Sequence, residues 1–269
     1  MISKNNLIIL IIVVLAFLST FFIIQSFVNK KNKFNLELVT TPEKPEAEKQ
    51  VKINVKLNDE NDKVVENLQI NHEKKAHFLL VRDDLTQFSH IHDKQDNSRI
   101  SAIFDLEHVF HEGGNYLFIA EFFSGGMDIV ERKMIYVNGE KKDYAENFDL
   151  NNSFNGYQVT LFNAEKIKPG NTVRLKYYIE KEGMPVNDLD LYLGATMHVS
   201  IFSEDLKNIV HTHGGMEMDS EMNNMRHASG LGPYVEFTNI FPTAGNYKLF
   251  GEFKHKGNVI LTEFWINVS

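Results

Sequence analysis

The chain has 269 residues, of which 43% are hydrophobic and 12% aromatic, enough to build buried cores and to exclude global disorder. A formal net charge of −8, with no basic stripe, argues against nucleic acid as a partner. The absence of Cys excludes disulfides, thiolate metal sites, cysteine nucleophiles and a lipid anchor attached through Cys.

Leu7 to Val28 carries no charged residue and is followed by no small-residue cleavage site. A helix of this length covers about 33 Å, and a bilayer core is about 30 Å thick. We therefore expect residues 1–28 to be an uncleaved transmembrane anchor, with a cleaved signal peptide as the alternative. Residues 29–33 are expected to be a polar spacer. Lysines flank the apolar segment on both sides, so charge alone does not fix its orientation.

An internal repeat organises the rest of the chain. The stretch from Ala76 to His92 reads His, twelve residues, His, one residue, His, and the same pattern returns at an offset of 121 residues from Met197. Further along, Gly114-Asn115-Tyr116 matches Gly245-Asn246-Tyr247 at an offset of 131 residues. The second copy therefore carries ten extra residues between these two motifs.

Short stretches of alternating apolar and polar residues, separated by turn residues, predict strands rather than helices in both copies. Val51 to Leu57 and Val173 to Tyr177 show this alternation, and Tyr247 to Val268 is expected to form a closing hairpin through Lys256-Gly257-Asn258. We expect an all-β fold of two tandem immunoglobulin-like β-sandwich repeats at 34–138 and 155–269, joined by a linker at 139–154. One larger β-sandwich is the alternative.

The three histidines of each copy can be placed by the register of a hairpin. If residues 83–86 form a four-residue loop, His77 faces His92, and His90 lies on the same face of its strand. Three imidazoles could then bind one ion at about 2.0–2.1 Å. The same reasoning groups His198, His211 and His213. Histidines in strands also pack against aromatic rings or form local hydrogen bonds, so structural histidines are the alternative. His72 and His255 stand apart from the pattern and are expected to be structural or exposed.

The ten extra residues of the second copy coincide with a methionine-rich segment in polar surroundings. Thioether sulfur is a soft ligand that suits Cu(I), whereas imidazole suits Cu(II) and Zn(II). A polar loop, or a lid with methionines packed on the sandwich, is the alternative. The candidate metal ligands of this segment are Met216, Met218, Met222, Met225 and His227.

Three stretches carry a resemblance to a known family: HFLLVRDDLTQFSHIH, DLYLGATMHVSIFSEDLKNIVHTH and the ending GNYKLFGEFKHKGNVILTEFWINV. The chain resembles bacterial exported or membrane-anchored proteins with two immunoglobulin-like repeats, some of which are associated with heavy-metal or copper handling. It is more loosely similar to periplasmic copper-resistance carriers, but it departs from them by placing its methionine-rich segment in an insertion of the second copy only.

These observations predict a non-enzymatic, membrane-anchored copper-binding protein, with zinc as the alternative metal, that buffers or transfers the ion outside the cytoplasm, in the periplasm or at the cell surface. The sequence shows no phosphate loop, nucleophile elbow, zinc-protease motif or dinucleotide fingerprint. The competing hypothesis is a surface interaction or scaffold module with structural histidines. We expect the membrane and a metal ion as partners, and the sequence leaves any protein partner unknown.

Overall fold

The computed structural model describes residues 34–215 and 230–269, which form an all-β, sandwich-type fold. Within these residues there is no α-helix, only a short 3-10 turn, Asp96–Ser98. In the first repeat a three-stranded sheet, ordered β1-β2-β5, faces a four-stranded sheet, ordered β4-β3-β6-β7. The strands are β1 Phe34–Thr41, β2 Gln50–Asp59, β3 Ala76–Arg82, β4 Phe88–Ile91, β5 Ile103–Val109, β6 Gly114–Ser124 and β7 Met127–Val137.

The second repeat has a five-stranded sheet and a four-stranded sheet ordered β13-β12-β15-β16. In the five-stranded sheet β9 pairs with one edge of β10, the short β11 and β14 both pair with its other edge, and β8 pairs with β9. Its strands are β8 Asn151–Phe154, β9 Tyr157–Phe162, β10 Thr172–Lys181, β11 Met184–Pro185, β12 Met197–Ser203, β13 Ile209–Gly214, β14 Tyr234–Ile240, β15 Gly245–His255 and β16 Asn258–Val268. The expected linker, 139–154, therefore includes β8 at its end. The turn at Asn155-Gly156 makes β8 a strand of the second repeat, because it pairs β8 with β9.

The strands form where the sequence alternates. Along β2, Val51, Ile53, Val55 and Leu57 are all buried and lie two residues apart, so one face of the strand is apolar. The closing hairpin pairs β15 with β16 as the sequence predicts, through a turn at Lys256-Gly257, both of which have positive φ. Two consecutive positive φ angles are typical of the tight turn that matches strand twist.

Each repeat has its own hydrophobic core between its two sheets. Phe78, Phe104 and Phe118 pack in the first core, and Tyr177, Phe237 and Phe264 in the second. Because no residue is shared between these two clusters, the chain forms two sandwiches rather than one larger one.

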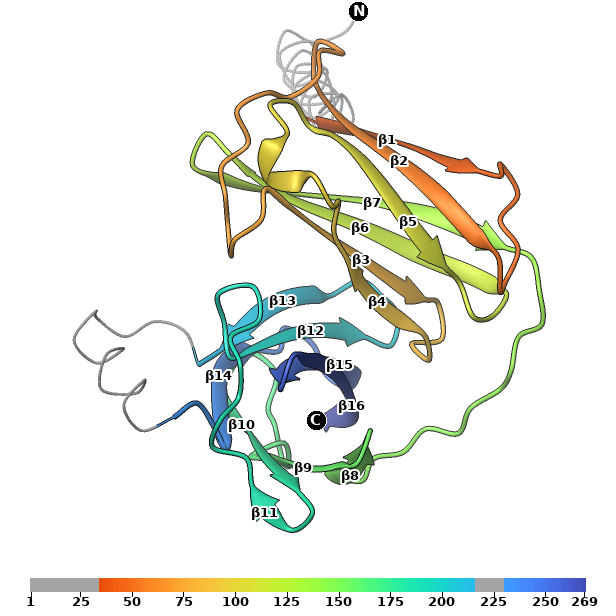
Figure 1. The fold of residues 1–269 in the computed structure, drawn as a ribbon. Helices are drawn as coiled ribbons and strands as arrows, with labels where there is room; N and C mark the ends of the chain where they lie inside the picture. The colour runs from red at the N-terminus through yellow and green to blue at the C-terminus, as the bar shows by residue number, and fades with distance from the viewer. Residues whose placement is uncertain (1–33, 216–229) are drawn as a thin grey trace, which may run out of the picture.

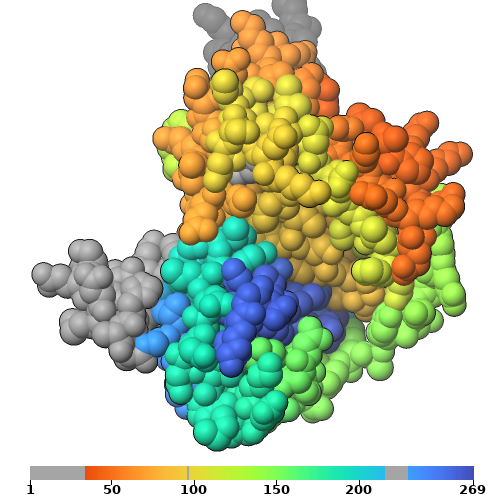
Figure 2. All heavy atoms as spheres, viewed as in Figure 1, coloured from red at the N-terminus to blue at the C-terminus, as the bar shows by residue number. Residues whose placement is uncertain are grey.

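The two four-stranded sheets also pack against each other, with β3 and β4 beside β12 and β13 (Figure 1). Every residue of β3 and β12 is buried, since one face lies in the sandwich core and the other in this contact. In Figure 2 the surfaces of the two repeats meet directly. We call the apolar part of this contact the inter-repeat core: Leu79, Val81, Leu85, Phe88, Leu117, Ile119, Phe202, Leu206, Ile209, Phe250, Leu261 and Trp265.

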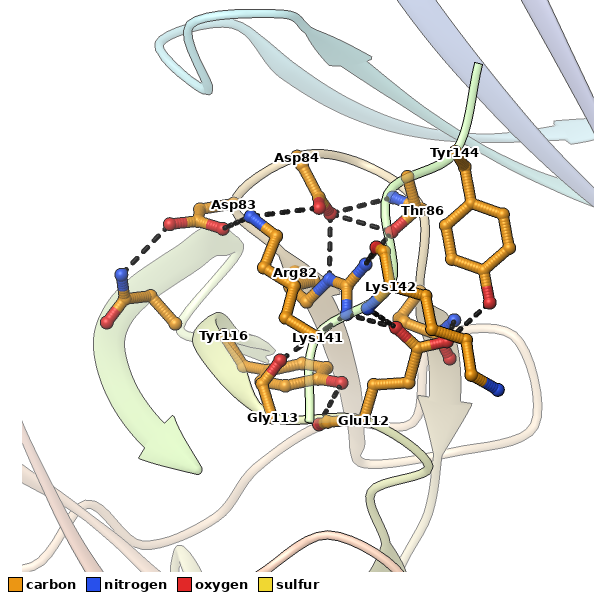
Figure 3. A network of polar contacts seen from close by, with 12 residues as sticks. Arg82, Asp83, Asp84, Thr86, Glu112, Gly113, Tyr116, Lys141, Lys142 and Tyr144 are labelled. Carbon is orange, nitrogen blue, oxygen red and sulfur yellow. Dashed lines mark hydrogen bonds and ion pairs between the residues drawn. The ribbon is translucent and has the colours of Figure 1, made fainter. Parts of the chain in front are cut away.

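A buried charge network holds the start of the linker on the first repeat (Figure 3). Arg82 is fully buried and donates to Glu112 at 2.6 Å, to Asp84 at 2.8 Å and to the carbonyl of Lys142. The backbone N–H of Lys142 and the hydroxyl of Tyr144 both donate to Glu112. At the repeat offsets, Ser203 and Thr243 occupy the positions of Arg82 and Glu112, so the network belongs to the first repeat only.

The expected transmembrane segment, Leu7 to Val28, and the spacer 29–33 lie outside the described residues. Across 34–215 and 230–269, the structure contains no helix with the length and apolar character that a membrane span requires.

Candidate metal centre

Six histidines, three from each repeat, lie on the faces through which the repeats contact each other. On β3, Leu79 and Val81 belong to the inter-repeat core, and His77 shares their face because side chains of a strand alternate. On β12, His198 shares a face with Phe202 in the same way. We call the six residues the histidine cluster: His77, His90, His92, His198, His211 and His213.

The hairpin register that the sequence predicts is present in both repeats. Arg82 N–H donates to the carbonyl of Gln87 at 2.9 Å, and Leu79 pairs with His90. In the second repeat His198 pairs directly with His213. Each repeat therefore brings its three histidines together on one face.

The structure brings the histidines of the two repeats close to one another. Ring centroids lie 5.1 Å apart for His90 and His211, and 5.4 Å apart for His77 and His211, although these residues belong to different repeats. Two sets of three histidines each have one nitrogen per ring within 4.8 Å of the others. One set is His77, His90 and His92, and the other is His90, His198 and His211, which spans both repeats. The packing of the two sheets thus merges the triads into one cluster.

His72, which the sequence set aside as structural or exposed, lies against this cluster. Its ring centroid is 3.6 Å from that of His213 in the other repeat. No spacing rule in the sequence points to it, because the contact exists only when the repeats are docked.

In five of the six rings, one nitrogen is held by a hydrogen bond to a carbonyl or a carboxylate. We call this the outer nitrogen, and the other nitrogen of the ring the inner nitrogen. His77 Nε2 donates to the carbonyl of Asn71 at 3.0 Å, and its counterpart His198 Nε2 donates to that of Tyr192 at 2.9 Å. His92 Nδ1 donates to the carbonyl of Ala76 at 3.1 Å. A carbonyl can only accept, so these nitrogens carry protons, and the other nitrogen of each ring is left as an electron-pair donor.

The other two of these five rings, His90 and His211, have their outer nitrogens against carboxylates of the opposite repeat. His90 Nδ1 lies 2.9 Å from Glu252 Oε2, and His211 Nδ1 lies 2.6 Å from Glu121 Oε2. Glu121 and Glu252 occupy equivalent positions in the two copies, so the same contact occurs twice. Carboxylates and carbonyls that accept from the second ring nitrogen are the usual partners of metal-binding histidines.

The inner nitrogens approach each other as ligands of one ion do. His77 Nδ1 lies 3.1 Å from His90 Nε2, and His198 Nδ1 lies 3.3 Å from His211 Nε2. Two nitrogens bound tetrahedrally at about 2.0–2.1 Å stand about 3.3 Å apart. In addition, the Nε2 atoms of His92 and His213 are buried without a hydrogen-bond partner. A buried polar atom without a partner costs about 1–3 kcal/mol, which coordination of a metal would offset.

Burial keeps the imidazoles of His77, His90, His92, His198 and His213 neutral. It is the main cause that lowers the pKa of His77 to about 4, of His92 and His198 to about 3, and of His213 to about 2, and the neighbouring histidines lower these pKa values further. The pKa of the fully buried His90 is also lowered well below its ordinary value for the same reasons. Neutral imidazole is the form that binds a metal.

Burial has the opposite effect on Glu252 and raises its pKa to about 8. A neutral Glu252 can donate to His90 Nδ1, His90 Nε2 can donate to His77 Nδ1, and His77 Nε2 donates to the Asn71 carbonyl. This series of hydrogen bonds satisfies the polar atoms of Glu252, His90 and His77 without a metal. If a metal binds His90 and His77, the shared proton must leave, and Glu252 then accepts from His90 as a carboxylate.

A surface pocket gives access to the cluster. It is lined by Asn71, His72, His77, Glu121, His211 and His213, among others. Three histidines of the cluster, His77, His211 and His213, therefore border this pocket.

Three other histidines lie away from the cluster. His255 is buried, with its nitrogens on the Tyr157 hydroxyl at 2.8 Å and on Asp188 at 3.0 Å, as a structural role predicts. His108 packs edge-on against Phe110, and His111 lies beside Glu48 at the surface. The remaining candidate ligands, Met216, Met218, Met222, Met225 and His227, lie outside the described residues.

Comparisons with solved structures give only distant similarity. The adhesin FdeC of Escherichia coli is 11% identical, with a TM-score of 0.26, and covers 87% of this chain and 62% of its own. The D00-D0 domain of intimin is 10% identical, with a TM-score of 0.24, and covers 88% of this chain and 99% of its own. Salmonella alpha-2-macroglobulin is 11% identical, with a TM-score of 0.29 and coverage of 88% and 15%. The chain thus spans less than two thirds of the adhesin and macroglobulin chains.

No curated protein sequence matches the chain. A family model does match it twice, over residues 31–139 and 152–269, and its description attaches no metal or other ligand. The copper association expected from the resemblance is therefore without support from the family. Because the two matches cover most of the sequence, the chain belongs to the family described as Domain of unknown function (DUF8832), of which it contains two copies.

Proposed function

We propose that the protein binds a transition-metal ion in the histidine cluster and acts as a non-catalytic buffer or carrier of that ion. Copper is the preferred assignment, and zinc is the alternative. The observation that carries the proposal is the arrangement of ring nitrogens: the outer ones are held by carbonyls and carboxylates, and the inner ones converge, with those of His92 and His213 buried and unpaired.

The donor set indicates the oxidation state. Neutral imidazoles with carboxylate partners suit Cu(II) and Zn(II). Thioethers suit Cu(I), so the methionines at 216, 218, 222 and 225 are proposed as additional Cu(I) ligands, which follow β13 and His213 in the sequence. We further propose that the apolar segment Leu7 to Val28 anchors the protein in a membrane with both repeats outside the cytoplasm. Protease shaving of intact spheroplasts tests this placement, because protection of the repeats until lysis would contradict it.

The test of metal binding is calorimetric titration of the purified protein with Zn(II) and Cu(II), compared with a variant that carries His90→Asn and His211→Asn. Asn keeps a polar side chain of smaller size and removes the inner nitrogen. The proposal expects at least tenfold weaker binding in the variant. His108→Asn is the matched control, because His108 lies outside the cluster. Equal affinity in all three proteins would reject the cluster as the site.

A surface interaction module is the second candidate, and two observations favour it. The metal-free hydrogen-bond chain through Glu252, His90 and His77 gives these histidines a structural role. In addition, the outer face of β9, β10 and β14 carries an aromatic patch, in which Tyr234 is 53% exposed and its ring centroid lies 4.8 Å from that of Tyr178. Exposed tyrosines are common in protein interfaces. A protein that binds no metal in the titration would leave this candidate as the better account.

A further inference from the structure

We infer that the ion held in the histidine cluster bridges the two repeats, so that metal binding and the docking of the repeats are coupled. This inference rests on the proposed function and concerns how the same site is built and controlled.

The ligands come from both repeats. His90 belongs to the first repeat, and His198 and His211 belong to the second, yet their nitrogens lie within 4.8 Å of one another. One ion at this position would bind to both repeats at once. When the repeats separate, neither retains this set of three.

The carboxylates that orient the ligands are also exchanged between the repeats. Glu252 of the second repeat contacts His90 of the first, and Glu121 of the first contacts His211 of the second. Separation would therefore remove the carboxylate partner from both rings. Loss of such a partner typically weakens metal affinity by about 10–100-fold.

Docking also keeps the bridging ligands dry. The side chains of His90 and His211 are 0% and 4% exposed, and both lie beside the inter-repeat core. Phe88 of the first repeat stacks on Phe250 of the second, with ring centroids 4.5 Å apart. The apolar contact thus holds the ligands in place before an ion arrives.

The linker favours this docked state. The Arg82 network fixes Lys142 and Tyr144 on the first repeat, and β8 of the second repeat begins at Asn151. The carbonyl of Leu150 already accepts from Leu161 N–H of β9, so only residues 145–149 connect the two attachments, and the second repeat stays at a high effective concentration beside the first. Because linkage is reciprocal, an ion that binds the docked state more tightly must also stabilise docking by the same factor.

The test uses a charge placed in the inter-repeat core, away from the ligands. Leu117 is 8% exposed, and its neighbour Phe118 points into the core of the first repeat instead. Leu117→Glu therefore disfavours docking and leaves that sandwich core intact. Met134 pairs with Leu117 on the neighbouring strand but is 56% exposed, so Met134→Glu is the matched control.

Docking is measured as the distance between two spin labels. The chain has no Cys, so Ile100→Cys and Met184→Cys, at positions 76% and 69% exposed, give one label on each repeat. In Leu117→Glu we expect Zn(II) affinity at least tenfold below the parent, a longer metal-free distance, and return of the parent distance at saturating Zn(II). Met134→Glu should stay within twofold of the parent in affinity and keep its distance.

An undocked Leu117→Glu protein that binds Zn(II) as tightly as the parent, or that binds it without return of the parent distance, would overturn the inference and leave the proposed function standing. If the single change leaves the distance unchanged, Val81→Glu is added, because Val81 pairs with Leu117 and is fully buried in the same core. Absence of Zn(II) binding in the parent itself would instead reject the proposed function.

Discussion

Acidification of the metal-free protein from pH 7 to pH 5 should open the contact between the repeats. Burial lowers the pKa of His77 to about 4, of His92 and His198 to about 3, and of His213 to about 2, while the same groups in the unfolded chain keep a pKa near 6.5. Between these values the unfolded or opened state binds protons that the docked state does not. Stability is therefore lost as the pH falls below 6.5.

The loss of stability depends mainly on the pKa of each histidine in the unfolded chain and on the final pH, because the lowered pKa values of the docked state lie below pH 5. The contribution of each of the four histidines to the stability of the docked state falls by about 2 kcal/mol between pH 7 and pH 5. Glu252 acts in the opposite direction: its raised pKa of about 8 makes the docked state gain protons, which offsets about 2.5 kcal/mol. The net loss is about 5 kcal/mol, a large part of the 5–15 kcal/mol that stabilises a typical domain.

Trp265 gives the assay, because it is the single Trp of the chain and lies in the inter-repeat core. In the presence of a chelator, its emission should shift to longer wavelength between pH 6.5 and 5, while circular dichroism still shows the strands. His108→Leu is the control, since His108 also has a pKa lowered to about 4 but lies away from the contact. Unchanged Trp265 emission and unchanged urea unfolding from pH 7 to pH 5 would refute the reasoning.

Three further changes test other parts of the structure. Arg82→Leu leaves the buried Glu112 without its ion-pair partner and should cost about 3–5 kcal/mol in urea unfolding, whereas Arg174→Leu, which removes an exposed pair with Glu236, should cost less than about 1 kcal/mol. His92→Leu should change the unfolding free energy of the metal-free protein by less than about 2 kcal/mol, because it removes an unpaired nitrogen together with one hydrogen bond, but it should weaken Zn(II) binding at least tenfold in calorimetry; retained affinity would exclude His92 as a ligand. Replacement of Met216, Met218, Met222 and Met225 by Leu should weaken Cu(I) binding in competition with a chromogenic chelator and leave Cu(II) binding intact, and equal Cu(I) affinity would remove these methionines from the account.

The local part of the site could be predicted from the sequence, because it depends on strand alternation and on one hairpin loop. The loop at residues 83–86 sets the pairing of β3 with β4, and the spacing of His90 and His92 then places both on one face. The repeat offset transfers the same register to His198 and His213.

The contact between the repeats could not be predicted in the same way, because no periodicity encodes which outer faces meet. The run from Ala76 to Val81 does indicate that the outer face of β3 is covered, since apolar residues on both faces of a strand indicate burial on both sides. The roles of Glu121 and Glu252 also depend on docking: the repeat alignment pairs them, but only the structure shows that each contacts a histidine of the other repeat.

The amount of metal retained by the purified protein tests the central claim most directly. After exposure to excess Zn(II) or Cu(II) and gel filtration, elemental analysis should find at least one ion per chain, and the variant with His90→Asn and His211→Asn should retain at most a small fraction of it. Metal contents that are equal in the two proteins, or near zero in both, would contradict the assignment of the histidine cluster as a metal centre.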